Sequence, residues 1–109
     1  MIRVLLVDDH PLVREGIRGM LAGQADIEVV GEAADGPAGV DAAGRLRPDL
    51  VLMDLRMPGG DGADATRAIA AAGTSRVVVL TTYETDQDIL RAIEAGAAGY
   101  LLKDIAPTA

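Results

Sequence analysis

The chain has 109 residues, of which 50% are hydrophobic and 25% charged, a balance typical of one folded domain rather than a disordered segment. Its formal net charge of −7 argues against nucleic-acid binding by this chain, because neutralising phosphates takes clustered Lys and Arg side chains. With no cysteine and no apolar run long enough for a membrane span, we expect a cytoplasmic protein without disulfides, zinc–thiolate sites or a membrane partner.

The first half of the chain predicts three strands and two helices. Ile2–Val7 is almost continuously apolar, which is typical of a buried strand. A helix is predicted from Pro11 to Gly23, since proline in a first helical turn loses no hydrogen bond and apolar residues then recur at helical spacing. The next predicted elements are a strand over Ile27–Ala33, a helix over 36–47 that ends before Pro48, and a strand over Asp49–Met53.

The second half continues the alternation after a loop rich in helix breakers, "LRMPGGDG". The predicted elements are a helix over Ala63–Ala72, a strand over Arg76–Leu80, a helix over Thr85–Ala95 and a strand over Gly99–Leu102. Short strands that alternate with helices imply βαβ units, and apolar strands imply that both faces of the sheet are covered. We therefore predict an α/β fold with a doubly wound, five-stranded parallel sheet.

The end of the chain departs from this alternation. In "KDIAPTA", Pro107 stands where a fifth helix is expected to begin, and only two residues follow it. We expect that helix to be absent or truncated. The sequence is then either a piece of a longer protein, or a chain that covers its open sheet face by dimerising or by exchanging elements.

Polar residues collect where the predicted strands end, and open α/β sheets bind their ligands at this edge. The first strand is followed by Asp8 and Asp9, the third by Asp54, the fourth by Thr81 and Thr82, and the fifth by Lys103. The second strand ends at Glu32 and Ala33 with nothing comparably placed. Three carboxylates, a hydroxyl and an amine are therefore predicted to converge.

This set of side chains points to metal-assisted phosphoryl chemistry. Two carboxylates about 4 Å apart repel each other by about 4 kcal/mol at an effective dielectric of about 20, so the group attracts a cation. Ligation by oxygen without Cys or His favours Mg²⁺, or Mn²⁺, over zinc. A carboxylate beside that cation and opposite a lysine can attack phosphorus, because both positive charges neutralise the phosphoryl oxygens.

Four motifs in order resemble the response-regulator receiver domain, the CheY-like fold: "LLVDDHP", "VLMDLRMPGGDG", "VVVLTTYE" and "AGAAGYLLKD". The opening "DDHPLVREGI" and the ending "LLKD" resemble the NarL/FixJ (LuxR-type) subfamily of two-component systems. The resemblance covers essentially the whole chain. It implies a flavodoxin-like sheet of strand order 2-1-3-4-5, with residues 1–109 as one receiver domain. It further implies that the C-terminal helix and a helix-turn-helix DNA-binding domain lie outside this chain.

By this resemblance, Asp54 is the phosphoacceptor and takes its phosphoryl group from the phosphohistidine of a sensor kinase. Together with Asp54, Asp9 would bind Mg²⁺ directly, and Asp8 would do so directly or through water. The carbonyl of Arg56 is the expected backbone ligand.

The same resemblance gives roles to three residues near the ends of the last two strands. Lys103 would pair with a phosphoryl oxygen, and the Thr81 hydroxyl would move in to hydrogen-bond the phosphoryl group. Tyr100 matches the aromatic switch, whose ring turns into the space that Thr81 vacates and so alters the output surface.

The implied function is a phosphorylation-dependent signalling switch that changes its dimerisation surface to control transcription. Its expected partners are a sensor histidine kinase and a second copy of itself, with DNA bound only through the missing domain. It is not expected to be a turnover enzyme, since it acts only on its own phosphorylation state. Two alternatives stay open: a dimerisation module that works without phosphorylation, and a Mg²⁺-dependent aspartate-nucleophile phosphatase, although such enzymes carry Asp-x-Asp rather than adjacent acids.

Each residue also has an ordinary structural interpretation. Asp8 could simply cap the first helix, because Asp is common at helix starts. Asp61 in "GGDG" is interpreted as a turn or cap residue. His10 follows the two acids but lacks evident ligand partners, and it is interpreted as a surface residue.

Overall fold

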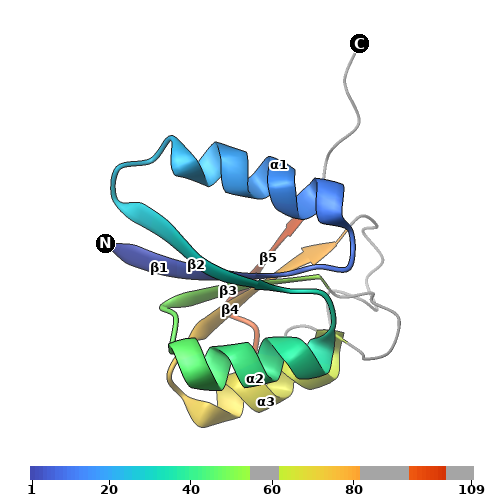
Figure 1. The fold of residues 1–109 in the computed structure, drawn as a ribbon. Coiled ribbons are helices and arrows are strands. Elements are labelled where there is room, and N and C mark those ends of the chain that lie inside the picture. Colours follow the sequence, from blue (N-terminus) through green and yellow to red (C-terminus); the bar gives the residue numbers. More distant parts are fainter. Residues whose placement is uncertain (55–61, 82–93, 103–109) are drawn as a thin grey trace.

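The chain folds into a five-stranded parallel sheet with helices on both faces (Figure 1). The computed structural model describes residues 1–54, 62–81 and 94–102. In chain order the elements are β1 (Ile2–Val7), α1 (Pro11–Ala22), β2 (Ile27–Ala33), α2 (Gly36–Leu46), β3 (Leu50–Asp54), α3 (Gly62–Ala72), β4 (Arg76–Thr81) and β5 (Gly99–Leu102). The strand order is β2-β1-β3-β4-β5, which confirms the predicted fold class and strand order.

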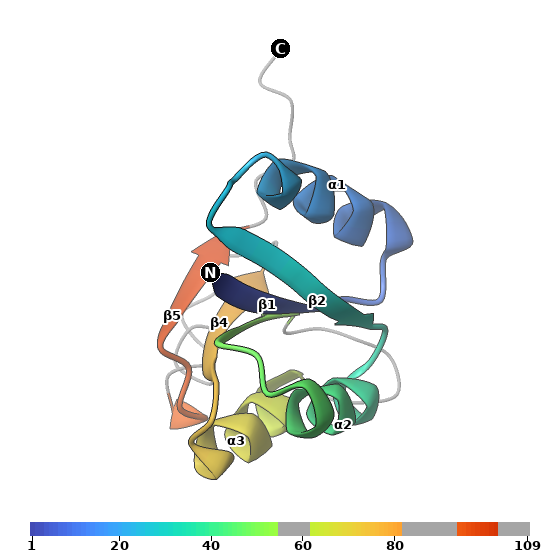
Figure 2. The ribbon, with the colours of Figure 1, turned by 60° about the vertical axis from the view of Figure 1, so that its left-hand side comes forward.

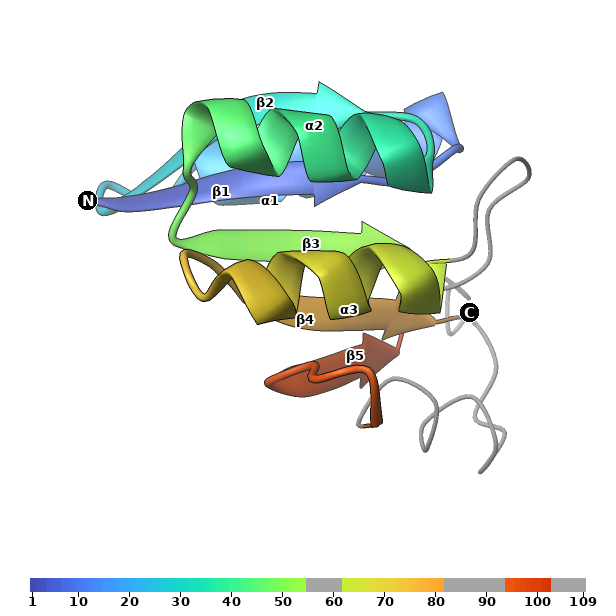
Figure 3. The same ribbon diagram turned by 90° about the horizontal axis from the view of Figure 1, so that it is seen from below.

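Helix α1 lies on one face of the sheet, and α2 and α3 lie on the other, as two views of the ribbon show (Figures 1 and 2). Because all the strands run in the same direction, their carboxyl ends meet at one edge (Figure 3). This edge is the place at which the sequence predicts a site.

The predicted boundaries agree with the structure to within one residue for the elements described. The one strand that shifts at both ends is β3, which runs from Leu50 to Asp54 rather than from Asp49 to Met53. Asp49 lies before the strand because its carboxylate accepts a hydrogen bond from the backbone N–H of Arg3 at 2.8 Å. The helix predicted over Thr85–Ala95 falls mainly on residues 82–93, and the fifth helix would follow residue 102; both lie outside the described residues.

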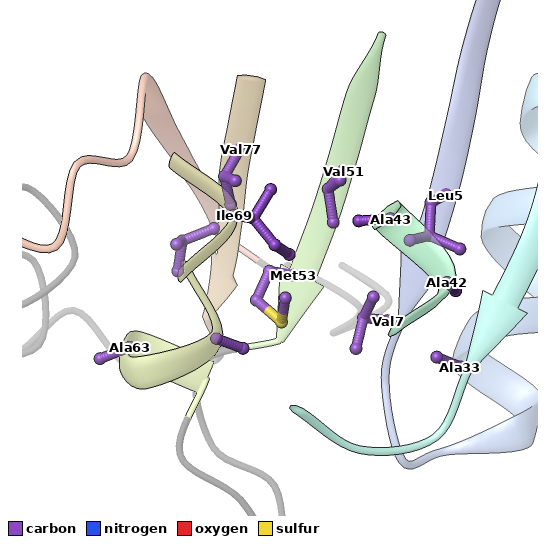
Figure 4. Packing of buried hydrophobic residues seen from close by; sticks show 12 residues of the cluster. Leu5, Val7, Ala33, Ala42, Ala43, Val51, Met53, Ala63, Ile69 and Val77 are labelled. Carbon is purple, nitrogen blue, oxygen red and sulfur yellow. The ribbon is translucent and has the colours of Figure 1, made fainter. Parts of the chain in front are cut away.

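The strands β1 and β3 are largely apolar because both faces of the sheet are covered there. Along β1, Leu5 and Val7 point toward α2 and α3, whereas Val4 and Leu6 point toward the α1 face. The α2 and α3 side is packed with small residues, so both helices approach the strands closely (Figure 4). Its helix residues are Ala42, Ala43, Ala63, Ala65 and Ile69. Burial on both faces holds the ends of β1 and β3 in fixed positions.

Gly39 lets α2 approach β1 closely. A Cβ atom added at Gly39 would lie 2.9 Å from Cγ1 and 3.0 Å from Cγ2 of Val7. Val7 is fully buried and β-branched, so it has no room to move aside. Gly44, in the same helix, has nothing within 4 Å of the equivalent position.

We predict opposite effects on stability for two glycine-to-alanine substitutions in α2. Gly39→Ala should lower the free energy of unfolding by about 1–2 kcal/mol, because overpacking against Val7 outweighs the better helix propensity of alanine. Gly44→Ala should raise it by about 0.5–1 kcal/mol, since only the propensity changes. Urea unfolding of the full chain measures both values, and a stabilising Gly39→Ala would show that α2 does not sit this close to β1.

Candidate metal centre

Four side chains with metal-ligand chemistry meet at the carboxyl ends of β1 and β3. One ligand atom from each of Asp8, Asp9, His10 and Asp54 lies within 4.8 Å of all the others. Asp8 and Asp54 are buried, Asp9 is half-buried and His10 is exposed. The strands pair in parallel with Val7 opposite Met53, so the next residue of each chain segment is an aspartate. The predicted convergence of the three carboxylates is confirmed.

The backbone and side chain of Asp8 are held by three neighbouring segments. Its N–H donates to the carbonyl oxygen of Ala33 at 3.0 Å, which continues the β1–β2 pairing by one residue. Its Oδ1 accepts a hydrogen bond from the backbone N–H of His10 at 2.8 Å, and its carbonyl oxygen accepts one from Arg14 Nη1 at 2.5 Å. The carboxylate is therefore held at the edge of the sheet before any ligand binds.

The simpler interpretation of Asp8 as the cap of the first helix is wrong. The N-cap residue of α1 is His10, and its side chain makes no capping hydrogen bond. The Asp8 carboxylate bonds the N–H of His10, in the turn before the helix, rather than an N–H inside the first helical turn.

His10 is exposed, as expected for a surface residue, but the interpretation that it lacks ligand partners is wrong. Its Nδ1 lies 2.9 Å from Asp9 Oδ1 and 3.3 Å from Asp8 Oδ1. Its position directly after two acids was the signal for this contact in the sequence. The imidazole therefore belongs to the same cluster as the carboxylates.

The donor set fits a divalent cation. Asp9 Oδ1 is buried, and among the described residues it has no hydrogen-bond partner, although it lies 2.9 Å from His10 Nδ1. Mg²⁺ prefers oxygen ligands, and proteins usually bind it through one or two carboxylates. A buried carboxylate oxygen without a hydrogen-bond partner is therefore a suitable ligand. His10 adds a nitrogen donor, which Mn²⁺ and other transition metals accept more readily than Mg²⁺ does.

A second group of charged residues, not predicted from the sequence, lies beside the acids. Glu32, near the end of β2, accepts a hydrogen bond from Arg14 Nε at 2.9 Å and also forms an ion pair with Arg18. Glu32 is not among the four clustered residues, in agreement with the expectation that the end of the second strand adds no comparable group to them. The four-residue spacing of the two arginines places them on one side of α1, but it did not indicate which acid they contact.

Of the remaining predicted site residues, only some lie in the described part of the chain. Thr81 is the last residue of β4 and pairs with Leu102, so its backbone lies at the predicted edge of the sheet. Tyr100 lies in β5 opposite Val79. The other residues named in the predictions, Arg56, Asp61, Thr82 and Lys103, lie outside the described residues.

The helices described, α1 to α3, are each too short or too polar to cross a bilayer.

Comparison with known proteins places this chain in a family. The model of the response regulator receiver domain matches residues 4–109. The transcriptional regulatory protein LiaR of Bacillus subtilis (strain 168) is 51% identical over 104 residues, which cover 94% of this chain and 49% of LiaR. The chain spans about half the length of the curated relatives that it matches.

Solved structures agree with this match. A LuxR-family two-component response regulator from Aurantimonas sp. SI85-9A1 superposes with a TM-score of 0.90 at 41% identity, covering 95% of this chain and 75% of that one. The isolated receiver domain of RcsB from Salmonella enterica serovar Typhimurium, solved with the phosphomimetic BeF₃⁻, gives 0.86 at 32% identity over 98% and 80%. With its sheet order, its acidic edge and these matches, the chain belongs to the response regulator receiver domain family, and its near relatives are NarL/LuxR-type regulators.

Proposed function

We propose that this chain is a phosphorylation switch in which Asp54 receives a phosphoryl group from a sensor histidine kinase. The observation that carries the proposal is the position of Asp54 at the end of β3, with ligand atoms of Asp8 and Asp9 within 4.8 Å. One Asp54 oxygen attacks the phosphorus of the kinase phosphohistidine. A P–O bond forms as the P–N bond breaks, and the imidazole leaves and takes up a proton. Burial of Asp54 favours this role, because it keeps water away from the acyl phosphate.

The acidic residues around Asp54 are proposed to hold a divalent cation, with Mg²⁺ preferred and Mn²⁺ as the alternative. Asp54 and Asp9 would bind it directly, Asp8 directly or through water, and Arg56 through its backbone carbonyl. When bound, the ion would supply positive charge to the phosphoryl oxygens. Asp8 is already held by hydrogen bonds to its backbone and carboxylate, so little rearrangement is needed for it to face the ion.

The remaining proposed steps concern residues at the ends of β4 and β5. Lys103 would pair with a phosphoryl oxygen, and the Thr81 hydroxyl would bond the phosphoryl group. This movement would favour the inward position of the Tyr100 ring and change the surface of the domain. The backbone register supports the proposal, because Thr81 and Tyr100 lie on neighbouring strands.

The change in surface is proposed to control a homodimer and, through it, transcription in the cytoplasm. LiaR is a transcriptional regulatory protein of about twice the matched length, which supports a DNA-binding segment beyond the receiver. DNA would then be a partner of that segment, since this chain carries a net charge of −7. The chain would act on its own phosphorylation state only and would not be a turnover enzyme.

A first test of the proposed function concerns the phosphoacceptor. With acetyl phosphate and Mg²⁺, the full chain should become phosphorylated, and Asp54→Asn should lower the labelled fraction at least about tenfold because the nucleophilic oxygen is lost. The matched control is Asp64→Asn, which removes an exposed carboxylate in α3 that pairs with Arg67 of the same helix. Intact-mass spectrometry measures the fraction.

Labelling of Asp54→Asn at the parental level would refute the assignment of the acceptor. Labelling that is lost in Asp8→Asn and kept in Asp54→Asn would favour the phosphatase alternative. An unlabelled parent that still dimerises would favour the module that acts without phosphorylation.

A second test of the proposed function concerns the cation site. For a dissociation constant of about 1 mM, about 10 mM Mg²⁺ should raise the free energy of unfolding by about 1.4 kcal/mol, since the ion binds only the folded state. Asp9→Asn should abolish most of this gain, and Asp64→Asn should keep it. Thermal unfolding at constant ionic strength measures the effect. The same gain in Asp9→Asn as in the parent would place the cation elsewhere.

A further inference from the structure

Arg14 connects α1, the end of β2 and the first acid of the cluster. Its Nη1 donates to the carbonyl oxygen of Asp8 at 2.5 Å, and its Nε donates to Glu32 Oε1 at 2.9 Å. The side chains of Arg14 and Glu32 are only 18% and 22% exposed, so this is a largely buried pair rather than a solvated surface contact. Pairs of this kind hold a defined geometry better than exposed ones do.

The hydrogen bond from Arg14 fixes the peptide group that joins the two acids. The Asp8 carbonyl oxygen belongs to the same planar unit as the N–H and Cα of Asp9, so holding that oxygen also fixes where the backbone of Asp9 begins. On the other side of Asp8, its N–H is held by Ala33, the residue after Glu32. The end of β2 therefore holds Asp8 twice, once directly and once through Arg14.

Glu32 also determines what the guanidinium of Arg14 can contact. A positive guanidinium close to three carboxylates is strongly attracted to them and would occupy the place of a cation. Glu32 accepts a hydrogen bond from Nε of Arg14, and Nη1 of the same guanidinium then donates to the Asp8 backbone carbonyl rather than to a carboxylate of the cluster. The arrangement keeps a positive charge beside the site without placing it among the acidic oxygens.

We propose that Arg14, held by Glu32, is a positioning residue of the metal centre: it orients the Asp8–Asp9 peptide so that both carboxylates face one cation. This inference rests on the proposed function, because it concerns the cation site of the switch. Residues that orient metal ligands from outside the ligand set typically change metal affinity about 10–100-fold when they are replaced.

The sign of the effect separates positioning from simple electrostatics. Removing a positive charge near a cation site strengthens cation binding if charge alone matters. Loss of positioning weakens binding. Arg14→Lys is the sharpest variant, because it keeps the charge while a single ammonium cannot reproduce the fork that reaches the Asp8 carbonyl and Glu32 together.

The experiment measures Mg²⁺ affinity by calorimetric titration of the full chain. Urea unfolding first determines the folded fraction of each variant. We expect Arg14→Lys and Arg14→Gln to bind Mg²⁺ about tenfold more weakly than the parent. The matched control is Arg18→Gln, which removes an arginine from the same Glu32, at a more exposed position, and leaves the bond to Asp8 in place. It should bind Mg²⁺ as tightly as the parent, or more tightly.

A second readout guards against an effect of stability alone. In NMR spectra of the metal-free protein, the chemical shifts of the Asp8 and Asp9 backbone amides should change in Arg14→Lys and stay unchanged in Arg18→Gln. Parental Mg²⁺ affinity in folded Arg14→Lys, or tighter binding in Arg14→Gln, would overturn the inference and leave the proposed function intact. A parent that binds no Mg²⁺ would overturn the cation site itself, and the inference with it.

Discussion

The parallel pairing of β1 with β3 is the constraint on which the site depends. Because Val7 lies opposite Met53, the chain places Asp8 and Asp54 beside each other where the two strands end. Buried carboxylates whose oxygens lie within 4.8 Å of each other repel, and a less firmly held loop would let them move apart. Here they stay together because the strands beneath them are buried on both faces of the sheet.

The neighbouring polar contacts moderate this repulsion without removing it. A backbone N–H bonds the Asp8 carboxylate, and the His10 ring lies within 3.3 Å of oxygens of both Asp8 and Asp9. Among the described residues, the guanidinium of Arg14 lies beside the cluster, and it is paired with Glu32 and a backbone carbonyl. The described part of the cluster therefore keeps an excess of acidic groups, which is the condition for the proposed binding of a divalent cation.

How well each feature could be predicted follows from the range of the interactions behind it. The bounds of β1 and β2 depend on local apolar pattern, and the sequence predicts them correctly. The start of β3 is shifted by one residue, because Asp49 is held by the backbone of Arg3, which lies 46 positions away. The pairing of Arg14 with Glu32 escaped prediction for the same reason, since it joins α1 to a strand across 18 positions.

The sequence by itself determined the order of strands and helices, the parallel sheet and the three acids at one edge. Each of these follows from periodicity and from the rule that parallel strands end on the same side. Only the tertiary structure decided how the acids are held. It set the turn from Asp8 to His10, the contact of the imidazole with two carboxylates, and the hydrogen bond from Arg14 to the Asp8 carbonyl oxygen. Such contacts depend on the distance between elements and on side-chain direction, and neither is encoded in the pattern of a single segment.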